Sequence, residues 1–243
     1  MLFSEKLRID MTELVLASNN KKKIAELQKL FDSADIGDIK ILSLRDIGYT
    51  EDIEEYGRSF EENSLIKASV PASLGYIGIA DDSGLCVDAL GGEPGIYSAR
   101  YSEDEGEADD RDAANRVKLL RKLDSTPDGE RGGAFVCVMS AVFPENGGFV
   151  VPEEYRAADE HTSFTGTDRE LSVTVRGECR GTITREEKGE GGFGYDNLFY
   201  SPELNKTFAE ATAEEKASVS HRGRAVSVFV KILAHIISES IKK

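Results

Sequence analysis

Short apolar runs alternate along this chain with amphipathic stretches, and this alternation restricts the fold to the α/β class. In the first unit, an apolar run at residues 14–17 is followed by a polar cluster at 18–20 and by apolar residues at helical spacing from Ile24 to Phe31. A strand, a turn and a helix are therefore predicted in that order. Further strands are expected at 40–44, 76–80 and 134–143, and further helices at 61–74, 111–123 and 225–241.

The domain organisation follows from the absence of any internal repeat or linker. A chain of 243 residues with 40% hydrophobic content can close one sizeable core. We therefore predict an N-terminal extension at 1–13 and a single mixed α/β domain at 14–243, lobed around a central cleft. The polar stretch 153–169 is expected to be a loop or insertion. Pro71 is expected to interrupt its helix, and Val117, Leu120 and Leu123 to share one helix face.

Composition excludes several classes of partner. The net charge is −15, from 30 Lys and Arg against 45 Asp and Glu, which argues against binding a nucleic-acid polymer or an anionic membrane over a broad face. No apolar run approaches the roughly 20 residues of a membrane helix, and the first dozen residues have no signal-peptide core. Three widely spaced cysteines predict neither a disulfide framework nor a metal site. The composition favours a reducing, cytoplasmic compartment.

Common catalytic motifs are absent or out of context. Gly189, Gly191 and Gly194 match a dinucleotide fingerprint, but a charged segment precedes them and no helix is predicted after them. The chain has no P-loop motif, and Ser83 lies in no nucleophile elbow. His161 and His235 have no partners at metal-ligand spacing.

The turn at residues 18–23 is the first candidate site. It joins a predicted strand to the start of a helix, where free backbone N–H groups and a partial positive charge favour an anion. Three consecutive lysines add positive charge. The segment is either a phosphate cradle or a well-capped helix with solvated lysines.

Carboxylates form the second candidate. Asp81 and Asp82 are expected at the end of a predicted strand, where open α/β sheets place ligands. Since successive side chains alternate, one can bind a divalent metal while the other anchors the turn. A simple Asp–Gly turn is the alternative. Glu54 and Glu55 form a second pair, which alone would be a solvated charge run.

Two later segments carry the features of base recognition. Residues 191–196 combine glycines with Phe193, Tyr195 and a carboxylate, so a base could approach the backbone and stack on either ring. A hairpin with core aromatics is the alternative. Residues 220–224 place His221 and Arg222 at a helix start, as polar recognition groups or as a cap.

Six segments in order resemble the inosine triphosphate pyrophosphatase (Ham1-like) family: residues 16–27, 59–68, 80–85, 91–101, 191–196 and 220–225. The resemblance implies an elongated mixed sheet flanked by helices, with two lobes around a substrate cleft. It also implies a homodimeric, Mg²⁺-dependent hydrolase that splits ITP, dITP or XTP into the monophosphate and pyrophosphate. The alternatives are a non-catalytic nucleotide sensor and a pyrophosphatase for other nucleotides.

The resemblance also assigns residues. Asp82 would be the proton acceptor and, with Glu55, a metal ligand, although Glu54 leaves a one-residue ambiguity. The substrate would be bound by Ser18, Asn19, Asn20, Lys21, Lys22, Lys23, Lys67, Ser83, Phe193, Gly194, Tyr195, Asp196, Lys216, His221 and Arg222.

Overall fold

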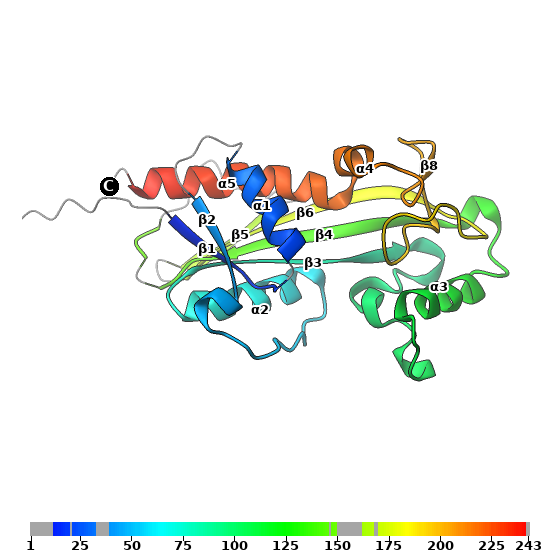
Figure 1. The fold of residues 1–243 in the computed structure, drawn as a ribbon, viewed down its shortest axis with the longest axis horizontal. Helices are drawn as coiled ribbons and strands as arrows, with labels where there is room; N and C mark the ends of the chain where they lie inside the picture. Colours follow the sequence, from blue (N-terminus) through cyan, green and yellow to red (C-terminus); the bar gives the residue numbers. More distant parts are fainter. Residues whose placement is uncertain are drawn as a thin grey trace, which may run out of the picture.

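One mixed sheet runs along the molecule, with helices on both of its faces (Figure 1). The computed structural model describes residues 12–19, 21–32, 39–145, 147–149, 162–167 and 170–241. In these ranges, eight strands pair in the order β2-β1-β3-β4-β6-β7-β8, with β5 also paired to β6. The strands are β1 (Thr12–Leu16), β2 (Ile39–Ser43), β3 (Ile77–Val87), β4 (Gly132–Val142), β5 (Thr162–Thr167), β6 (Glu170–Ile183), β7 (Phe199–Ser201) and β8 (Lys206–Thr207).

Helices α1, α4 and α5 lie on one side of the sheet, and α2 and α3 on the other (Figure 1). The α-helices are α1 (Lys21–Asp32), α2 (Phe60–Ser73), α3 (Arg111–Lys122), α4 (Ala213–Val219) and α5 (His221–Ile241). The short 3-10 helices are η1 (Arg45–Ile47), η2 (Asp88–Leu90), η3 (Gly95–Arg100), η4 (Glu103–Glu105) and η5 (Asp128–Glu130). Strand β1 pairs in parallel with β2 and β3, and the remaining pairings are antiparallel. The predicted mixed α/β sheet is confirmed.

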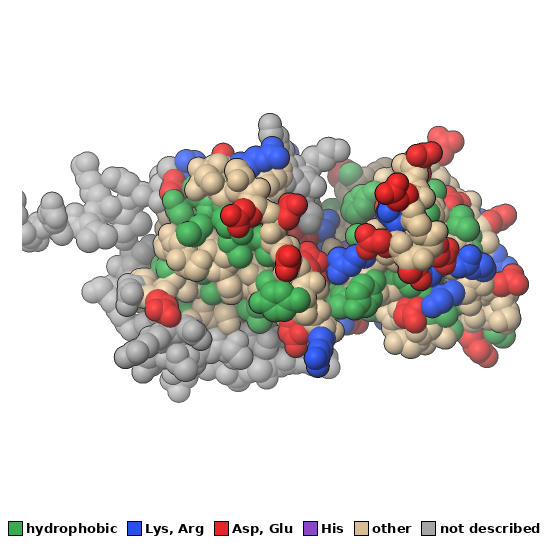
Figure 2. All heavy atoms as spheres, turned by 90° about the horizontal axis from the view of Figure 1, so that it is seen from below, with side chains coloured by type: hydrophobic (Ala, Val, Ile, Leu, Met, Phe, Trp, Pro, Cys, Tyr) green, Lys and Arg blue, Asp and Glu red, His purple; other side chains and the backbone are tan. Residues whose placement is uncertain are grey.

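Long strands join two separate hydrophobic cores. Near one end, Ile79 of β3 and Met139 of β4 belong to the core beneath α5. Near the other end, Leu85 and Phe135 of the same strands belong to a core that includes Leu119 of α3. Figure 2 shows the surface hollowed between these two parts, with Lys and Arg side chains beside the notch. The two lobes are therefore held together by continuous β-ladders.

The predicted elements are present, with the following corrections. Helix α2 continues through Pro71 to Ser73, so the proline lies in the last turn of the helix and does not interrupt it. Within the stretch predicted as loop, residues 162–167 form β5, since β6 offers them a paired edge. Val117 is 61% exposed, whereas Leu123 is fully buried, so they do not share a face. The last helix begins at residue 221 instead of 225.

Some sequence-based predictions lie outside the described residues. The structure does not describe residues 1–11, 150–161 and 168–169. The predicted extension at 1–13 and the predicted insertion at 153–169 therefore stay predictions. No helix in the described ranges combines the length and apolarity needed to cross a bilayer.

A buried arginine ties the end of α3 to the end of β6. Arg131 is 2% exposed, and its guanidinium donates to the carbonyls of Leu123 at 2.6 Å, Ile183 at 2.8 Å and Thr184 at 3.0 Å. Removing the donors leaves buried carbonyls unsatisfied, so we expect Arg131→Ala to lower the free energy of unfolding by about 3 kcal/mol or more. Urea denaturation measures this. The matched control Arg185→Ala removes an exposed ion pair with Asp128 and should cost about 1 kcal/mol or less. Equal losses would contradict the assignment.

Candidate active site

The site forms where β1 ends and its neighbour β3 continues beyond it. Strand β1 pairs with β3 as far as Leu16 opposite Ile79, and the chain then turns toward α1. From Asp81 onward, β3 continues against its antiparallel partner β4, which pairs with it through Val87. The prediction that Asp81 and Asp82 end a strand is wrong, because the β4 ladder carries the strand through a turn-like sequence. Both carboxylates still lie beside the end of a parallel strand, as in open α/β sheets.

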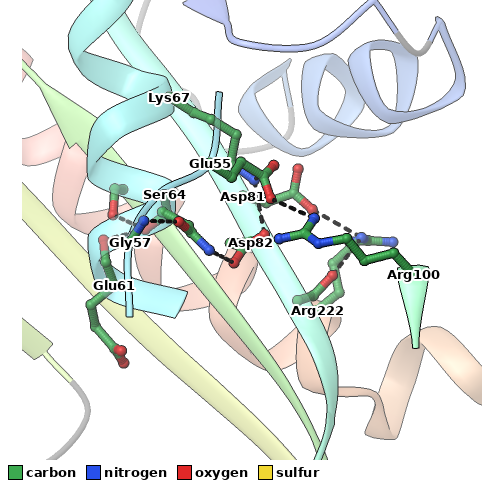
Figure 3. Close-up of polar contacts among 12 residues, drawn as sticks. Glu55, Gly57, Glu61, Ser64, Lys67, Asp81, Asp82, Arg100 and Arg222 are labelled. Carbon is green, nitrogen blue, oxygen red and sulfur yellow. Dashed lines mark hydrogen bonds and ion pairs between the residues drawn. The ribbon is translucent and has the colours of Figure 1, made fainter. Parts of the chain in front are cut away.

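The two adjacent aspartates contact different helices, as their alternation predicts. Asp82 accepts a hydrogen bond at 2.9 Å from Lys67 of α2, whereas Asp81 accepts one at 2.9 Å from Arg222 of α5. Figure 3 shows these groups converging on one stretch of β3. Asp81 does not anchor a turn, as had been expected, because the strand continues past it. It holds an arginine that the sequence had assigned to base recognition.

Helix α2 supplies two groups to Asp82. Ser59 caps the helix by accepting from the backbone N–H of Glu62 at 3.1 Å. With the start fixed, Asn63 and Lys67 lie one turn apart on the same face. Asn63 is fully buried, donates to Asp82 Oδ2 at 3.3 Å and accepts from Gly57 N–H at 2.9 Å. The sequence analysis assigned no role to Asn63, although the residue lies in the family-like segment 59–68.

Lys67 joins two carboxylates from different segments. Its Nζ lies 2.9 Å from Glu55 Oε1 and 2.9 Å from Asp82 Oδ1. Burial raises the pKa of Asp82, and attraction to Lys67 opposes that rise without cancelling it. Burial alone would lower the pKa of Lys67, but the two carboxylates outweigh it and raise the value. Of the two neighbouring glutamates, Glu55 lies in this cluster, while Glu54 is exposed.

The predicted base-recognition turn is built around Asp196. This carboxylate is 2% exposed and accepts from the Phe193 N–H at 2.9 Å and from Lys216 Nζ at 2.5 Å. Gly192 has a φ of 76°, and a Cβ there would lie 2.2 Å from Asp196 Oδ2, so the turn requires glycine. Phe193 is 67% exposed, with Lys216 Nζ 4.7 Å from its ring centroid.

Tyr195 and Gly194 of this turn are both held by hydrogen bonds within the protein, and their predicted substrate contacts stay predictions. Tyr195 is 4% exposed in the second core and donates to the carbonyl of Ser98 at 2.9 Å, so its ring cannot stack on a base as it stands. Burial raises the pKa of its hydroxyl. Gly194 donates its N–H to Asp112 at 2.8 Å and accepts from Arg116 at 3.0 Å. Phe193 is therefore the aromatic ring of this turn that faces outward.

The start of α5 connects this turn to β3. Lys216 lies on α4 and Arg222 on α5, and Ser220 is the single residue between the two helices. Arg222 also lies 3.4 Å from the hydroxyl of Ser83. His221 is buried and stacks on Phe135, with ring centroids 4.9 Å apart. Burial lowers the pKa of His221 to about 3, which leaves it neutral near pH 7. Within the described chain its Nδ1 atom is buried without a hydrogen-bond partner.

The predicted phosphate segment lies at the same edge of the sheet. Ala17 still pairs with β3 through a bond from its N–H to Ile79 O at 2.8 Å, so the chain leaves the sheet at Ser18, close to where Asp81 follows on β3. The side chain of Asn19 accepts from the backbone N–H of Arg45 at 3.2 Å. Asn20 and the side chains of Lys21, Lys22 and Lys23 are outside the described part, so their phosphate role stays a prediction.

The residues present suit a hard cation with few protein ligands. No group of three or more His, Cys, Asp or Glu residues that could hold a metal occurs in the described ranges. Glu55 and Asp82 nevertheless share one ammonium, which already marks a cation position. Magnesium is commonly held by one or two carboxylates together with water and substrate phosphates. The pair therefore fits such an ion.

Comparisons with known proteins agree with this geometry. Residues 14–232 match the sequence model of the Ham1 family. A dITP/XTP pyrophosphatase of Bacillus cereus is 40% identical over 217 residues, which are 89% of this chain and 92% of the relative. The solved structure of the Staphylococcus aureus Ham1 protein aligns with a TM-score of 0.73 and 38% identity, covering 92% of this chain and 99% of that one. The Ham1 protein of Coxiella burnetii gives a TM-score of 0.74 at 34% identity, over 93% and 100% of the two chains.

Proposed function

This chain belongs to the Ham1 family, and from that premise we propose that it hydrolyses non-canonical purine nucleoside triphosphates, namely dITP, ITP and XTP, to the nucleoside monophosphate and pyrophosphate. The observation that carries the proposal is the largely buried Lys67 ammonium shared by Glu55 and Asp82. Asp82 lies on β3, the strand whose Asp81 and Ser83 side chains Arg222 contacts. Relatives that are named dITP/XTP pyrophosphatases support the substrate class.

We propose Mg²⁺ as the metal, held by Glu55 and Asp82. When bound, the ion would neutralise phosphate charge and make a water molecule more acidic. Phosphoanhydride hydrolysis depends mainly on positioning and charge neutralisation. Two carboxylates oriented by Lys67 and Asn63 would hold the cation that supplies the charge neutralisation, and no covalent nucleophile is required.

Asp82 is the residue placed to accept the proton of the attacking water. A general base works best when its pKa is moved toward the working pH, and burial moves Asp82 in that direction. Lys67 fixes one oxygen of this carboxylate and Asn63 the other. The base is thereby held in a single orientation, which reduces the reorganisation that the reaction requires.

Selectivity for the nucleotide base would come from Phe193 and from the donors at the start of α5. Phe193 offers an exposed ring for stacking. Arg222 and His221 can donate to a 6-oxo group, whereas the 6-amino group of adenine would face them with a donor of its own. The unpartnered Nδ1 of His221 supports a polar ligand there, because an unsatisfied buried nitrogen costs about 1–3 kcal/mol.

Substrate profiling tests the proposal. With Mg²⁺ present, we expect kcat/KM for dITP and XTP to exceed that for dATP by about 10⁴-fold, because adenine leaves buried donors unpaired. Pyrophosphate release in an enzyme-coupled assay measures each value. A chain that binds dITP without turnover would be the non-catalytic sensor, and equal rates on dATP would point to a less selective pyrophosphatase. The homodimer and the cytoplasmic compartment stay predictions.

A further inference from the structure

Arg100 reaches the carboxylate cluster of Glu55 and Asp82 from the 3-10 helix η3. It is the last residue of η3, and its NH1 lies 3.8 Å from Glu55 Oε2, the oxygen that Lys67 does not contact. Its guanidinium carbon lies 5.4 Å from the ring centroid of Tyr97, within the range of a cation–π interaction. Figure 3 shows Arg100 and Arg222 extending from different elements toward Asp81 and Asp82.

The guanidinium of Arg100 has donor capacity to spare. In the described part of the chain its interaction with Glu55 is an ion pair longer than a hydrogen bond. Arg222, by contrast, donates to Asp81 at 2.9 Å. The Arg100 side chain is 37% exposed. A planar fork of five N–H donors is thus accessible beside the two proposed metal ligands.

The backbone that carries Arg100 is fixed on several sides. The hydroxyl of Ser98 accepts from the β3 residue Leu85 at 2.8 Å. Asn115 of α3 donates to the carbonyls of Ser98 at 3.2 Å and Ala99 at 3.1 Å. A Cβ at Gly84 would lie 2.4 Å from the Gly95 carbonyl, so η3 packs directly on β3. Arg100 is therefore presented by a preorganised segment.

We propose that Arg100 is a further substrate-binding residue, which donates hydrogen bonds to the polyphosphate chain of the nucleotide. This inference rests on the proposed function. If Glu55 served as a metal ligand, its carboxylate would be less available to the Arg100 guanidinium, which pairs with it at 3.8 Å. Phosphate oxygens then offer the guanidinium a better partner, because its fork matches two of them at once. Arg100 thus acts on substrate from η3, next to the proposed metal ligand Glu55.

Binding of inorganic pyrophosphate to Arg100→Ala tests this directly. With Mg²⁺ present, we expect the Kd from titration calorimetry to rise by about 10- to 100-fold, the effect of losing charge-assisted hydrogen bonds. Arg100→Lys should recover only part of the loss, since an ammonium lacks the fork. The KM for dITP should rise by a similar factor, with a smaller change in kcat, and the affinity for the nucleoside deoxyinosine should not change. The control Arg180→Ala removes an exposed ion pair with Asp88 and should leave every value as in wild type.

Two results would overturn the inference. Arg100→Ala could bind pyrophosphate as tightly as wild type, or it could change only the Mg²⁺ concentration needed for activity, in which case Arg100 merely orients Glu55. Failure of the proposed function gives a different result, namely wild-type protein without turnover of dITP. The pyrophosphate titration still decides the role of Arg100 in that case.

Discussion

Asp82→Asn is expected to lower kcat for dITP by at least about 10³-fold, since general-base catalysis contributes about 10²–10⁴-fold and a metal ligand is weakened as well. Asparagine keeps the size of the side chain and can still accept from Lys67, but it cannot take a proton. The fold should therefore persist, with little change in the thermal midpoint. Steady-state kinetics and a thermal melt on the same preparation measure both.

The matched control is Asp128→Asn, at a carboxylate whose side chain is 80% exposed. It should keep wild-type kcat. The pH profile adds a second check, because the deprotonated form of Asp82 is the active one. As the pH falls, kcat/KM should decline at a higher pH than an ordinary aspartate would give, because burial raises the pKa of this group. If Asp82→Asn retained a tenth or more of wild-type kcat, Asp82 would not be the base.

Lys67→Met is expected to lower kcat/KM by about 10²-fold or more, comparable with removing one preorganised donor from a developing charge. Methionine fills similar space without the ammonium that Glu55 and Asp82 share. Without this attraction the pKa of Asp82 rises further, so the acid limb of the profile moves to higher pH. The variant should bind Mg²⁺ at least as tightly as wild type, because two carboxylates lose their internal counterion.

Lys67→Arg serves as the charge-conserving comparison. It should retain Mg²⁺ binding and a wild-type acid limb, and more activity than Lys67→Met, although its geometry differs. Circular dichroism checks that both variants fold. An unshifted acid limb in Lys67→Met would show that Lys67 does not set the protonation of Asp82.

Local patterns predicted most of the elements, and two of the exceptions have one cause. The sequence Asp-Asp-Ser-Gly is typical of a turn, yet β3 runs through it because β4 pairs with it from Gly78 to Val87. Residues 162–167 form a strand for the same reason, since β6 supplies the edge. Both depend on pairing between distant segments, which no local window contains. Tyr195 illustrates the converse, because a ring expected to stack on a base is buried in the second core.

The candidate site was predictable only in part. Family motifs named Glu55, Lys67 and Asp82, and the structure brings their side chains within hydrogen-bond distance. Asn63 and Arg100 lie in the family-like segments 59–68 and 91–101, but no role was predicted for either residue. Their contacts with Asp82 and Glu55 join residues that are far apart in the chain. The positions of such supporting groups follow from packing of α2 and η3 on β3.

Product stoichiometry with dITP and Mg²⁺ tests the central claim most directly. Hydrolysis followed by ion-exchange chromatography should give one deoxyinosine monophosphate and one pyrophosphate for each dITP consumed, with no orthophosphate in a phosphatase-free assay. Release of orthophosphate with the diphosphate as first product would contradict the account, because the chain would then act as a stepwise phosphatase.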